Sequence, residues 1–194
     1  QGVLDGDIVP ILCGSAVNNV GVDVLLDEVV NFLPSPCDRP SFKGTNPKTG
    51  EEIRREMKVD EPFSALVFKT IVDPFVGKLS IFKVMSGELN SGATVYNANK
   101  DVNEKTTALY MLKGKKQNQI TKITAGDIGA FAKLQQTETG DTLCDVASPI
   151  IYKGIEFPEP AISMAIEVEK EGEEDKVFGG LNRMAEEDPT FRIE

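Results

Sequence analysis

The stretch from Gly77 to Asn97, GKLSIFKVMSGELNSGATVYN, decides the fold expected for this chain. Its first half crowds β-branched, aromatic and other apolar side chains into a short run, which is typical of a strand with a partly buried surface. Asn90-Ser91-Gly92 then supplies residues that tolerate positive φ, and an extended pattern resumes at Ala93. The stretch therefore predicts two antiparallel strands joined by a short connection. Because one hairpin cannot bury its own face, it needs further strands.

The sequence around this hairpin supplies such strands within residues 61–148, and no helical periodicity separates them. Extended segments are predicted at Pro62–Asp73, Thr106–Leu112, Ile120–Ile123, Ile128–Leu134 and Thr142–Cys144. Turns are predicted at Asn99-Lys100-Asp101, at Ala125-Gly126-Asp127 and at Thr139-Gly140-Asp141, and a basic loop at Lys113-Gly114-Lys115-Lys116. About six or seven short strands in one range predict a closed or nearly closed barrel, because closure removes exposed sheet edges.

The segment before the barrel, residues 1–36, has α/β character. Ile8–Cys13 is a short apolar run suited to a buried strand, and Gly14-Ser15-Ala16 ends it in a turn. From Val22 the apolar residues recur at the spacing of one helical face, and Pro34 ends the pattern. Since a strand, a turn and a helix do not complete an α/β domain, we expect the last unit of one. The chain also lacks an initiating Met, and we expect it to be part of a longer protein.

Two further segments flank the barrel. Residues 37–60 are polar and broken by Pro and Gly, which predicts a linker with one tight turn at Asn46 to Gly50. In residues 149–194, the alternation over Ala161–Val168 predicts a strand with one buried face. A helix is predicted to follow until Asp188-Pro189, and the next strand to begin at Phe191–Ile193. This order is the opening of an α+β domain.

Composition narrows the classes of function. No apolar run is long enough to cross a membrane. The three widely spaced cysteines form neither a disulfide framework nor a Cys-x-x-Cys zinc site, so we expect a cytoplasmic protein. We also expect a monomer. The absence of His removes the commonest general base and metal ligand. The net charge of -10 is uneven: residues 61–148 carry 10 basic and 9 acidic side chains, whereas residues 149–194 carry 5 and 12. Nucleic-acid contact is therefore expected only from the middle segment, and no DNA or membrane partner is expected.

Several motifs carry a resemblance to a known family. PFSALVFKTIVDPFVGKLSIFKVMSGELNSG, AGDIGAF and TETGDTLCD together resemble domain II of translational GTPases of the elongation factor G type. FPEPAISMAIEVE and LNRMAEEDPTF resemble the first half of domain III, and CGSA resembles the last nucleotide-binding motif of the GTPase domain. The resemblance implies a mainly β chain with a domain II barrel at 61–148. A helix-containing remnant of the GTPase domain at 1–36, the linker at 37–60 and a partial ferredoxin-like domain III at 149–194 would flank it.

The resemblance also implies a nucleotide in the parent protein. Ser15 and Ala16 occupy the turn whose backbone amide contacts guanine in the family, and GTP with Mg²⁺ would be the cofactors of the full-length GTPase. This chain contains no G-x-x-x-x-G-K-[ST] phosphate loop, which supplies the amides and the Lys that hold the β and γ phosphates. Asn99-Lys100-Asp101 imitates a guanine motif but lacks the spacer before Asp. We therefore expect no cofactor and no catalysis in the chain itself.

The implied partner is the small ribosomal subunit, its RNA and its proteins. Phosphate contact needs exposed cations, and the candidates are Lys78, Lys83, Lys113, Lys115 and Lys116, for which ordinary solubilising lysines are the alternative. Phe75 is expected in the core, with stacking on a nucleobase as the alternative. The acidic run Glu171, Glu173, Glu174 and Asp175 is expected to be a solvated helix start rather than a metal site. After Met111 the sequence LKGKKQNQ replaces the family's usual histidine and polar turn, which is more similar to divergent members than to the main translocase.

Three classes of function are compatible with these patterns. The first is the ribosome-binding middle portion of an elongation factor G-like GTPase, acting in elongation or, alternatively, in ribosomal protection or recycling. The second is a protein-interaction barrel that works without RNA. The third is a carboxylate-based hydrolase that would use a pair such as Asp127 and Asp141, although their spacing does not favour it. Salt-sensitive binding to ribosomal particles separates the first class from the others.

Overall fold

The computed structural model describes residues 2–38, 41–73, 75–168 and 172–193, and it contains two compact units, Gln1–Pro40 and Ser41–Glu194. The first unit holds helix α1 (Val22–Phe32) and a 3-10 turn at Pro36–Asp38. The predicted helix is therefore confirmed. The predicted strand at Ile8–Cys13 is wrong: the segment has no strand structure, and Ile11 is 89% exposed. A strand needs a hydrogen-bonding neighbour, and no strand lies beside this segment within the described part of the first unit.

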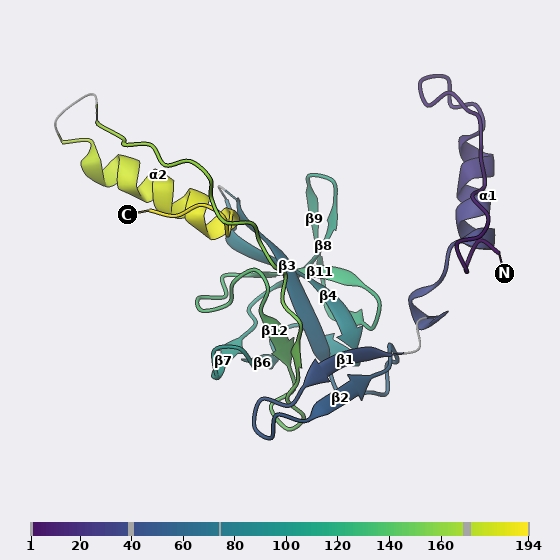
Figure 1. Ribbon diagram of the computed structural model, residues 1–194, viewed down its shortest axis with the longest axis horizontal. Coiled ribbons are helices and arrows are strands. Elements are labelled where there is room, and N and C mark those ends of the chain that lie inside the picture. Colours follow the sequence, from purple (N-terminus) through teal and green to yellow (C-terminus); the bar gives the residue numbers. More distant parts are fainter. Residues whose placement is uncertain (1, 39–40, 74, 169–171, 194) are drawn as a thin grey trace. The chain divides into compact units, whose positions relative to one another are not determined.

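The second unit is built mainly from strands and ends in one helix (Figure 1). Its first half contains β1 (Phe42–Thr45), β2 (Glu52–Arg55), β3 (Ser64–Asp73), β4 (Gly77–Ser86), β5 (Glu88–Asn90), β6 (Thr94–Asn97) and β7 (Val102–Lys105). Its second half contains β8 (Leu109–Lys113), β9 (Lys116–Ile120), β10 (Lys122–Thr124), β11 (Ile128–Ala132), β12 (Thr142–Cys144), β13 (Ile151–Tyr152) and α2 (Glu174–Glu187). The mainly β fold class is confirmed.

Eight of these strands form one antiparallel sheet in the order β7-β6-β12-β3-β4-β11-β8-β9, and β5 pairs separately with β10. Buried side chains from β3, β4, β6, β8, β10, β11 and β12 meet in a single core, so the sheet curls around one interior. At the centre of this core Phe82 stacks on Phe131 with ring centroids 4.2 Å apart. The terminal strands β7 and β9 each pair on one side only, which makes this a nearly closed barrel.

The hairpin predicted within Gly77–Asn97 is wrong, although both of its strands exist. β4 pairs with β3 and β11, whereas β6 pairs with β12 and β7. The chain leaves β4 at Gly87, whose φ is +72°, and the next three residues form β5 against β10. Turn chemistry at Asn90-Ser91-Gly92 was therefore compatible with a sharp reversal, but long-range pairing decided which strands became neighbours.

Three other local predictions differ from the structure. Residues 37–60 are more than a linker, because β1 and β2 form a hairpin around the predicted turn at Asn46–Gly50 and β13 extends it to three strands. β7 follows the predicted turn at Asn99–Asp101 as an unpredicted strand. The predicted strands at Ala161–Val168 and Phe191–Ile193 are wrong, and Ile162 is 83% exposed. An alternating pattern becomes a strand only when a neighbour supplies its ladder, and no described strand pairs with either segment.

The helix of the C-terminal segment forms as the apolar spacing predicts, and Asp188 ends it with a bond from its amide to the carbonyl of Met184. Glu173, Glu174 and Asp175 lie at the start of α2, where acidic side chains complement the helix dipole. Glu171 lies outside the described residues. At the other end of α2, the Glu187 carboxylate accepts a hydrogen bond from the amide of Val72, so this helix contacts the end of β3.

A buried polar network fixes the loops at the β6 end of the barrel. Asn97 is fully buried; its Oδ1 accepts from the amides of Asn99 and Lys100 at 3.1 Å, and its Nδ2 donates to Asp141 Oδ2 at 2.8 Å. Asp141 Oδ2 also accepts from the amide of Glu138. One amide side chain therefore joins the turn after β6 to the turn before β12.

Replacing Asn97 with Ala should lower the free energy of unfolding by roughly 2 to 3 kcal/mol, because buried groups of both turns lose their partner. Urea denaturation followed by circular dichroism measures this change. Asn103→Ala is the matched control, since Asn103 is exposed on the neighbouring strand β7, and it should change the unfolding free energy by less than about 0.5 kcal/mol. Equal losses in the two variants would contradict the structural role of the network.

Candidate nucleic-acid interface

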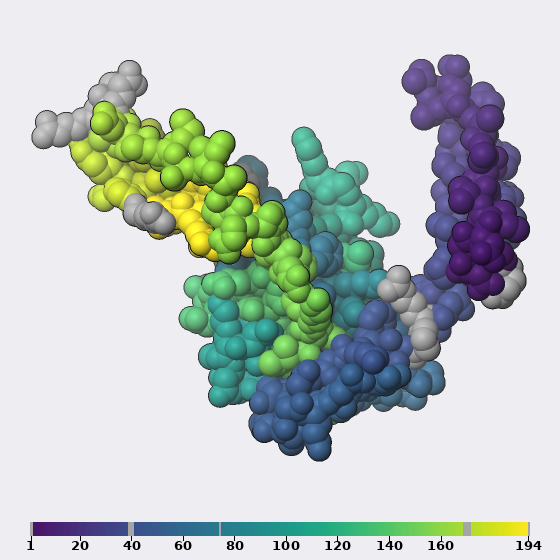
Figure 2. Space-filling model, in the orientation of Figure 1, coloured from purple at the N-terminus to yellow at the C-terminus, as the bar shows by residue number. Residues whose placement is uncertain are grey.

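Three of the predicted lysines gather at the tip of the β8–β9 hairpin. Lys113 and Lys116 pair across the two strands, and Gly114 with Lys115 forms the two-residue turn between them. Gly114 has a φ of +58° at the first central position, the pattern of a type II′ turn, which suits the twist of a hairpin. The predicted basic loop is thus shorter than expected, because Lys116 already begins β9. We call residues 113–117 the lysine hairpin; it projects from the barrel in Figure 2.

The lysine hairpin carries unpaired positive charge. Within the described ranges, none of Lys113, Lys115 and Lys116 makes an ion pair, and all three are exposed. Several other cations of the second unit are neutralised, as in the pairs Lys100–Glu138 at 2.6 Å and Lys122–Glu88 at 2.5 Å, whereas the lysine hairpin gathers three unpaired lysines within four residues. A cation without an acidic partner keeps its charge available for a phosphate group. The hairpin is therefore the best-supported anion-binding feature of the chain.

Lys78 and Lys83 both lie on β4 but face different surroundings. Lys78 pairs with Val72 next to the β3–β4 turn, so it stands at the tip of that hairpin. Lys83 lies farther along β4, opposite Ile128 and Leu66, and it is partly buried. Since side chains alternate along a strand, an odd spacing of five residues places the two lysines on opposite faces. The structure places Lys78 at a hairpin tip with Phe75, while Lys83 lies toward the middle of the sheet.

Phe75 corrects the expectation drawn from its sequence. The predicted core position is wrong, because Phe75 is 96% exposed at the β3–β4 turn. Beside it, Asp73 Oδ1 accepts hydrogen bonds from the amides of Phe75 at 2.8 Å and Val76 at 2.9 Å. We call residues 73–77 the Phe75 loop, of which Pro74 is outside the described residues. An aromatic ring so exposed suits stacking better than barrel closure.

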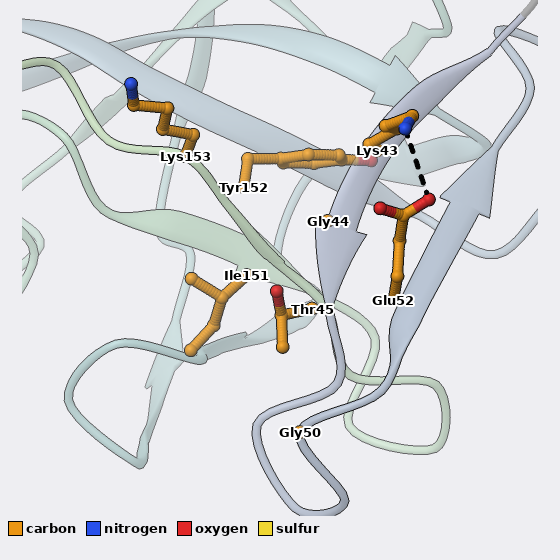
Figure 3. Close-up of a pocket in the computed structure, with 8 residues that line it drawn as sticks. All are labelled: Lys43, Gly44, Thr45, Gly50, Glu52, Ile151, Tyr152 and Lys153. Carbon is orange, nitrogen blue, oxygen red and sulfur yellow. Dashed lines mark ion pairs between the residues drawn. The ribbon is translucent and has the colours of Figure 1, made fainter.

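Two surface hollows of similar size differ in chemistry. The one at the β1–β2–β13 sheet measures about 470 Å³, but its cations are occupied: Lys43 pairs with Glu52 at 3.4 Å, as Figure 3 shows, and Lys153 pairs with Glu156 at 2.9 Å. The second, about 400 Å³, lies under the Phe75 loop and is lined also by Tyr110 and Lys133. Because Lys133 makes no ion pair with a described residue, only the second hollow combines aromatic surface with an available cation.

The carboxylates considered for hydrolysis serve as turn caps. Asp127 Oδ2 accepts from the amide of Thr124 at 3.2 Å and from its hydroxyl at 3.0 Å. Asp141 belongs to the buried network around Asn97. Each carboxylate thus has a local structural role, and the described residues contain no group of three or more His, Cys, Asp or Glu suited to a metal ion. No helix among them is long and apolar enough to cross a bilayer.

The turn at Ser15 and Ala16 lies in the first unit and has internal bonds of its own. The Ser15 amide donates to the Val20 carbonyl at 2.9 Å, and Ser15 Oγ accepts from the Asn18 amide at 3.3 Å. Ala16 is exposed, and its amide donates to no acceptor in the described part of the chain. Of the two predicted guanine contacts, the geometry therefore fits the Ala16 amide best, since an exposed amide can donate to a carbonyl edge.

A nearly closed β-barrel within residues 61–148 is the fold that the resemblance to domain II implies. Comparison with known families agrees: the model of elongation factor G domain 2 matches residues 62–146, and that of elongation factor G domain III matches residues 157–194. Together the two matches cover more than half of the chain. This chain belongs to the elongation factor G family of translational GTPases.

The solved structures give the same fold. A crystal structure of a protein from Thermus thermophilus superposes with a TM-score of 0.76 and 24% sequence identity, over 100% of this chain and 26% of that protein. At this identity the match shows the fold alone. The chain spans about a quarter of the length of that protein.

Proposed function

We propose that this chain is the middle portion of an elongation factor G-like GTPase, and that its barrel binds the RNA of the small ribosomal subunit and so positions the GTPase there during elongation. The observation that carries the proposal is the lysine hairpin, a set of unpaired cations on a chain whose net charge is -10. Family membership supports a GTP-hydrolysing parent. In that parent the cofactors are GTP and Mg²⁺, and the turn at Ser15 and Ala16 contacts guanine, with the exposed Ala16 amide as the donor. The parent acts as a cytoplasmic monomer.

Removing the three lysines should weaken binding to small ribosomal subunits in a salt-dependent way. In the variant Lys113→Ala, Lys115→Ala, Lys116→Ala, we expect the slope of log affinity against log salt to fall by roughly two to three, because each lost phosphate contact releases about one counterion fewer. Co-sedimentation of the chain with purified small subunits at several salt concentrations measures the slope.

The matched control removes the same charge from lysines that already have acidic partners. The variant Lys58→Ala, Lys153→Ala, Lys176→Ala loses ion pairs with Glu56, Glu156 and Glu173, and its salt slope should stay close to that of the unmodified chain. Equal effects in both triple variants would show a response to net charge alone and would overturn the assigned site. Binding that resists both salt and RNase would instead favour a protein-interaction barrel.

A further inference from the structure

One carboxylate joins the two hairpins that carry the candidate RNA contacts. Asp73 Oδ1 holds the Phe75 loop through two backbone amides, while its Oδ2 accepts from Gln117 Nε2 of β9 at 2.8 Å. The hydrogen bonds from the amides of Val76 and Phe75, and then from Gln117, lower the pKa of Asp73 below its ordinary value, because they stabilise the ionised carboxylate. Gln117 directly follows the lysines of its hairpin. The Phe75 loop and the lysine hairpin are thus linked side chain to side chain.

Apolar packing supports the same arrangement. Val76 of the Phe75 loop and Leu112 of β8 both pack against one outer cluster of the sheet, which is built around Leu79 and Ile81. In the ladder, Leu112 is the partner of Gln117. The base of the lysine hairpin and the Phe75 loop therefore pack against the same apolar cluster, and the hydrogen bond from Gln117 to Asp73 adds a polar link between them.

The two hairpins offer two kinds of contact, aromatic stacking and positive charge, that a single ligand could use together. Phe75, 96% exposed above a hollow that also contains Tyr110, offers a flat aromatic face. Lys113, Lys115 and Lys116 offer charges without acidic partners. A single strand of RNA carries bases that stack on aromatic rings and phosphates that attract lysines, at a spacing fixed by its backbone. A protein partner would match the charges but has no regular series of flat rings beside them.

We infer that the Phe75 loop and the lysine hairpin form one two-armed surface for an unpaired RNA strand, with Gln117 as the positioning residue that keeps the arms in register. The inference rests on the proposed function and deepens it by naming single-stranded RNA as the form recognised. Gln117 acts through Asp73 and needs no contact with the RNA itself. Its loss should leave both arms present but independent of each other.

A double-mutant cycle tests this dependence. The cycle compares three variants, Phe75→Ala, Lys115→Ala and the double variant, in the unmodified chain and again in the Gln117→Ala chain. The probe is a fluorescently labelled RNA of mixed sequence and about 12 nucleotides, which is long enough to span a single-strand site. In the unmodified background the losses of affinity should be coupled by about three- to tenfold, whereas in the Gln117→Ala background they should multiply independently. Gln119→Ala is the matched control, because Gln119 is exposed two residues along the same strand. It should leave the coupling intact.

A second measurement reports on the link without any RNA. Gln117→Ala should shift the amide resonances of Phe75 and Val76 in ¹H–¹⁵N spectra, since their acceptor Asp73 loses a neighbour, and Gln119→Ala should not. Coupling that persists in Gln117→Ala, or amide shifts that do not change, would overturn the inference and leave ribosome binding standing. An unmodified chain that binds neither small subunits nor the RNA probe would remove the proposed function first, and the inference with it.

Discussion

Replacing Phe131 with Ala should lower the free energy of unfolding by about 3 to 5 kcal/mol, the usual cost of removing a buried aromatic ring. Phe131 is fully buried on β11, between β4 and β8, and its ring lies 4.2 Å from that of Phe82 with an angle of 16° between the planes. The surrounding strands are held in hydrogen-bonded ladders and cannot collapse into the space without breaking them. The loss therefore combines the removed apolar surface, the lost stacking and a cavity.

Denaturation in urea measures this loss, with circular dichroism as the signal. Phe75→Ala is the matched control, since the same ring is removed from a position that is 96% exposed, and its unfolding free energy should change by less than about 0.5 kcal/mol. If Phe131→Ala were as stable as Phe75→Ala, the single core shared by the strands of the barrel would be contradicted.

Replacing Gly87 with Ala should destabilise the barrel by roughly 3 kcal/mol or more, or prevent folding. Gly87 has a φ of +72°, and a Cβ there would lie 2.5 Å from the Glu61 carbonyl oxygen and 2.6 Å from the Phe63 nitrogen. Both are backbone atoms, so no side-chain rotation relieves the overlap. The Gly87 amide also donates to Lys58 and its carbonyl accepts from Ala125, each at 2.8 Å, so three segments converge at this residue.

Gly92 is the internal control for this second variant. It lies five residues on in the same SGELNSG motif and has a φ of +82°, but a Cβ there would meet nothing within 4 Å. Gly92→Ala should therefore show the left-handed backbone cost alone, about 1 kcal/mol. Thermal unfolding of both variants measures the difference. Similar losses in the two would show that backbone conformation, rather than close approach, accounts for Gly87.

The motifs that carried the family resemblance gain physical explanations from these contacts. The Gly of SGE is required by the close approach of backbone atoms at Gly87, whereas a Cβ at the second Gly of AGDIGAF, Gly129, would lie 2.4 Å from Ile123 Cδ1 and would require that side chain to shift. The spacing alone could show only that these glycines end a strand or interrupt one. It could not show which segments pass close to them, because the fold, rather than the spacing, brings Glu61 and Phe63 to Gly87 and Ile123 to Gly129.

The candidate interface was only partly predictable. Lysines at a Gly-containing turn are visible in the sequence as available charge, and the structure leaves the three of the lysine hairpin exposed. Phe75 was expected in the core, since an aromatic residue between two strands is most often buried. Gln117 gave no signal, because its function depends on Asp73, which lies more than forty residues away in the sequence. A residue that acts by positioning another can be recognised only once its contact is known, and the fold decides that contact.

By itself, the sequence determined the elements whose causes are local: the strand pattern of β4, the helices α1 and α2, the turns at Asn46–Gly50 and Asn99–Asp101, and the family. Only the tertiary structure decided the pairing of β4 with β3 and β11, the hairpin within residues 42–55, the absence of strands at Ile8–Cys13 and Ala161–Val168, and the meeting of the Phe75 loop with the lysine hairpin. The physical reason is that side-chain periodicity determines which face of a segment is apolar, whereas the hydrogen-bonding partner of a strand must come from elsewhere in the chain.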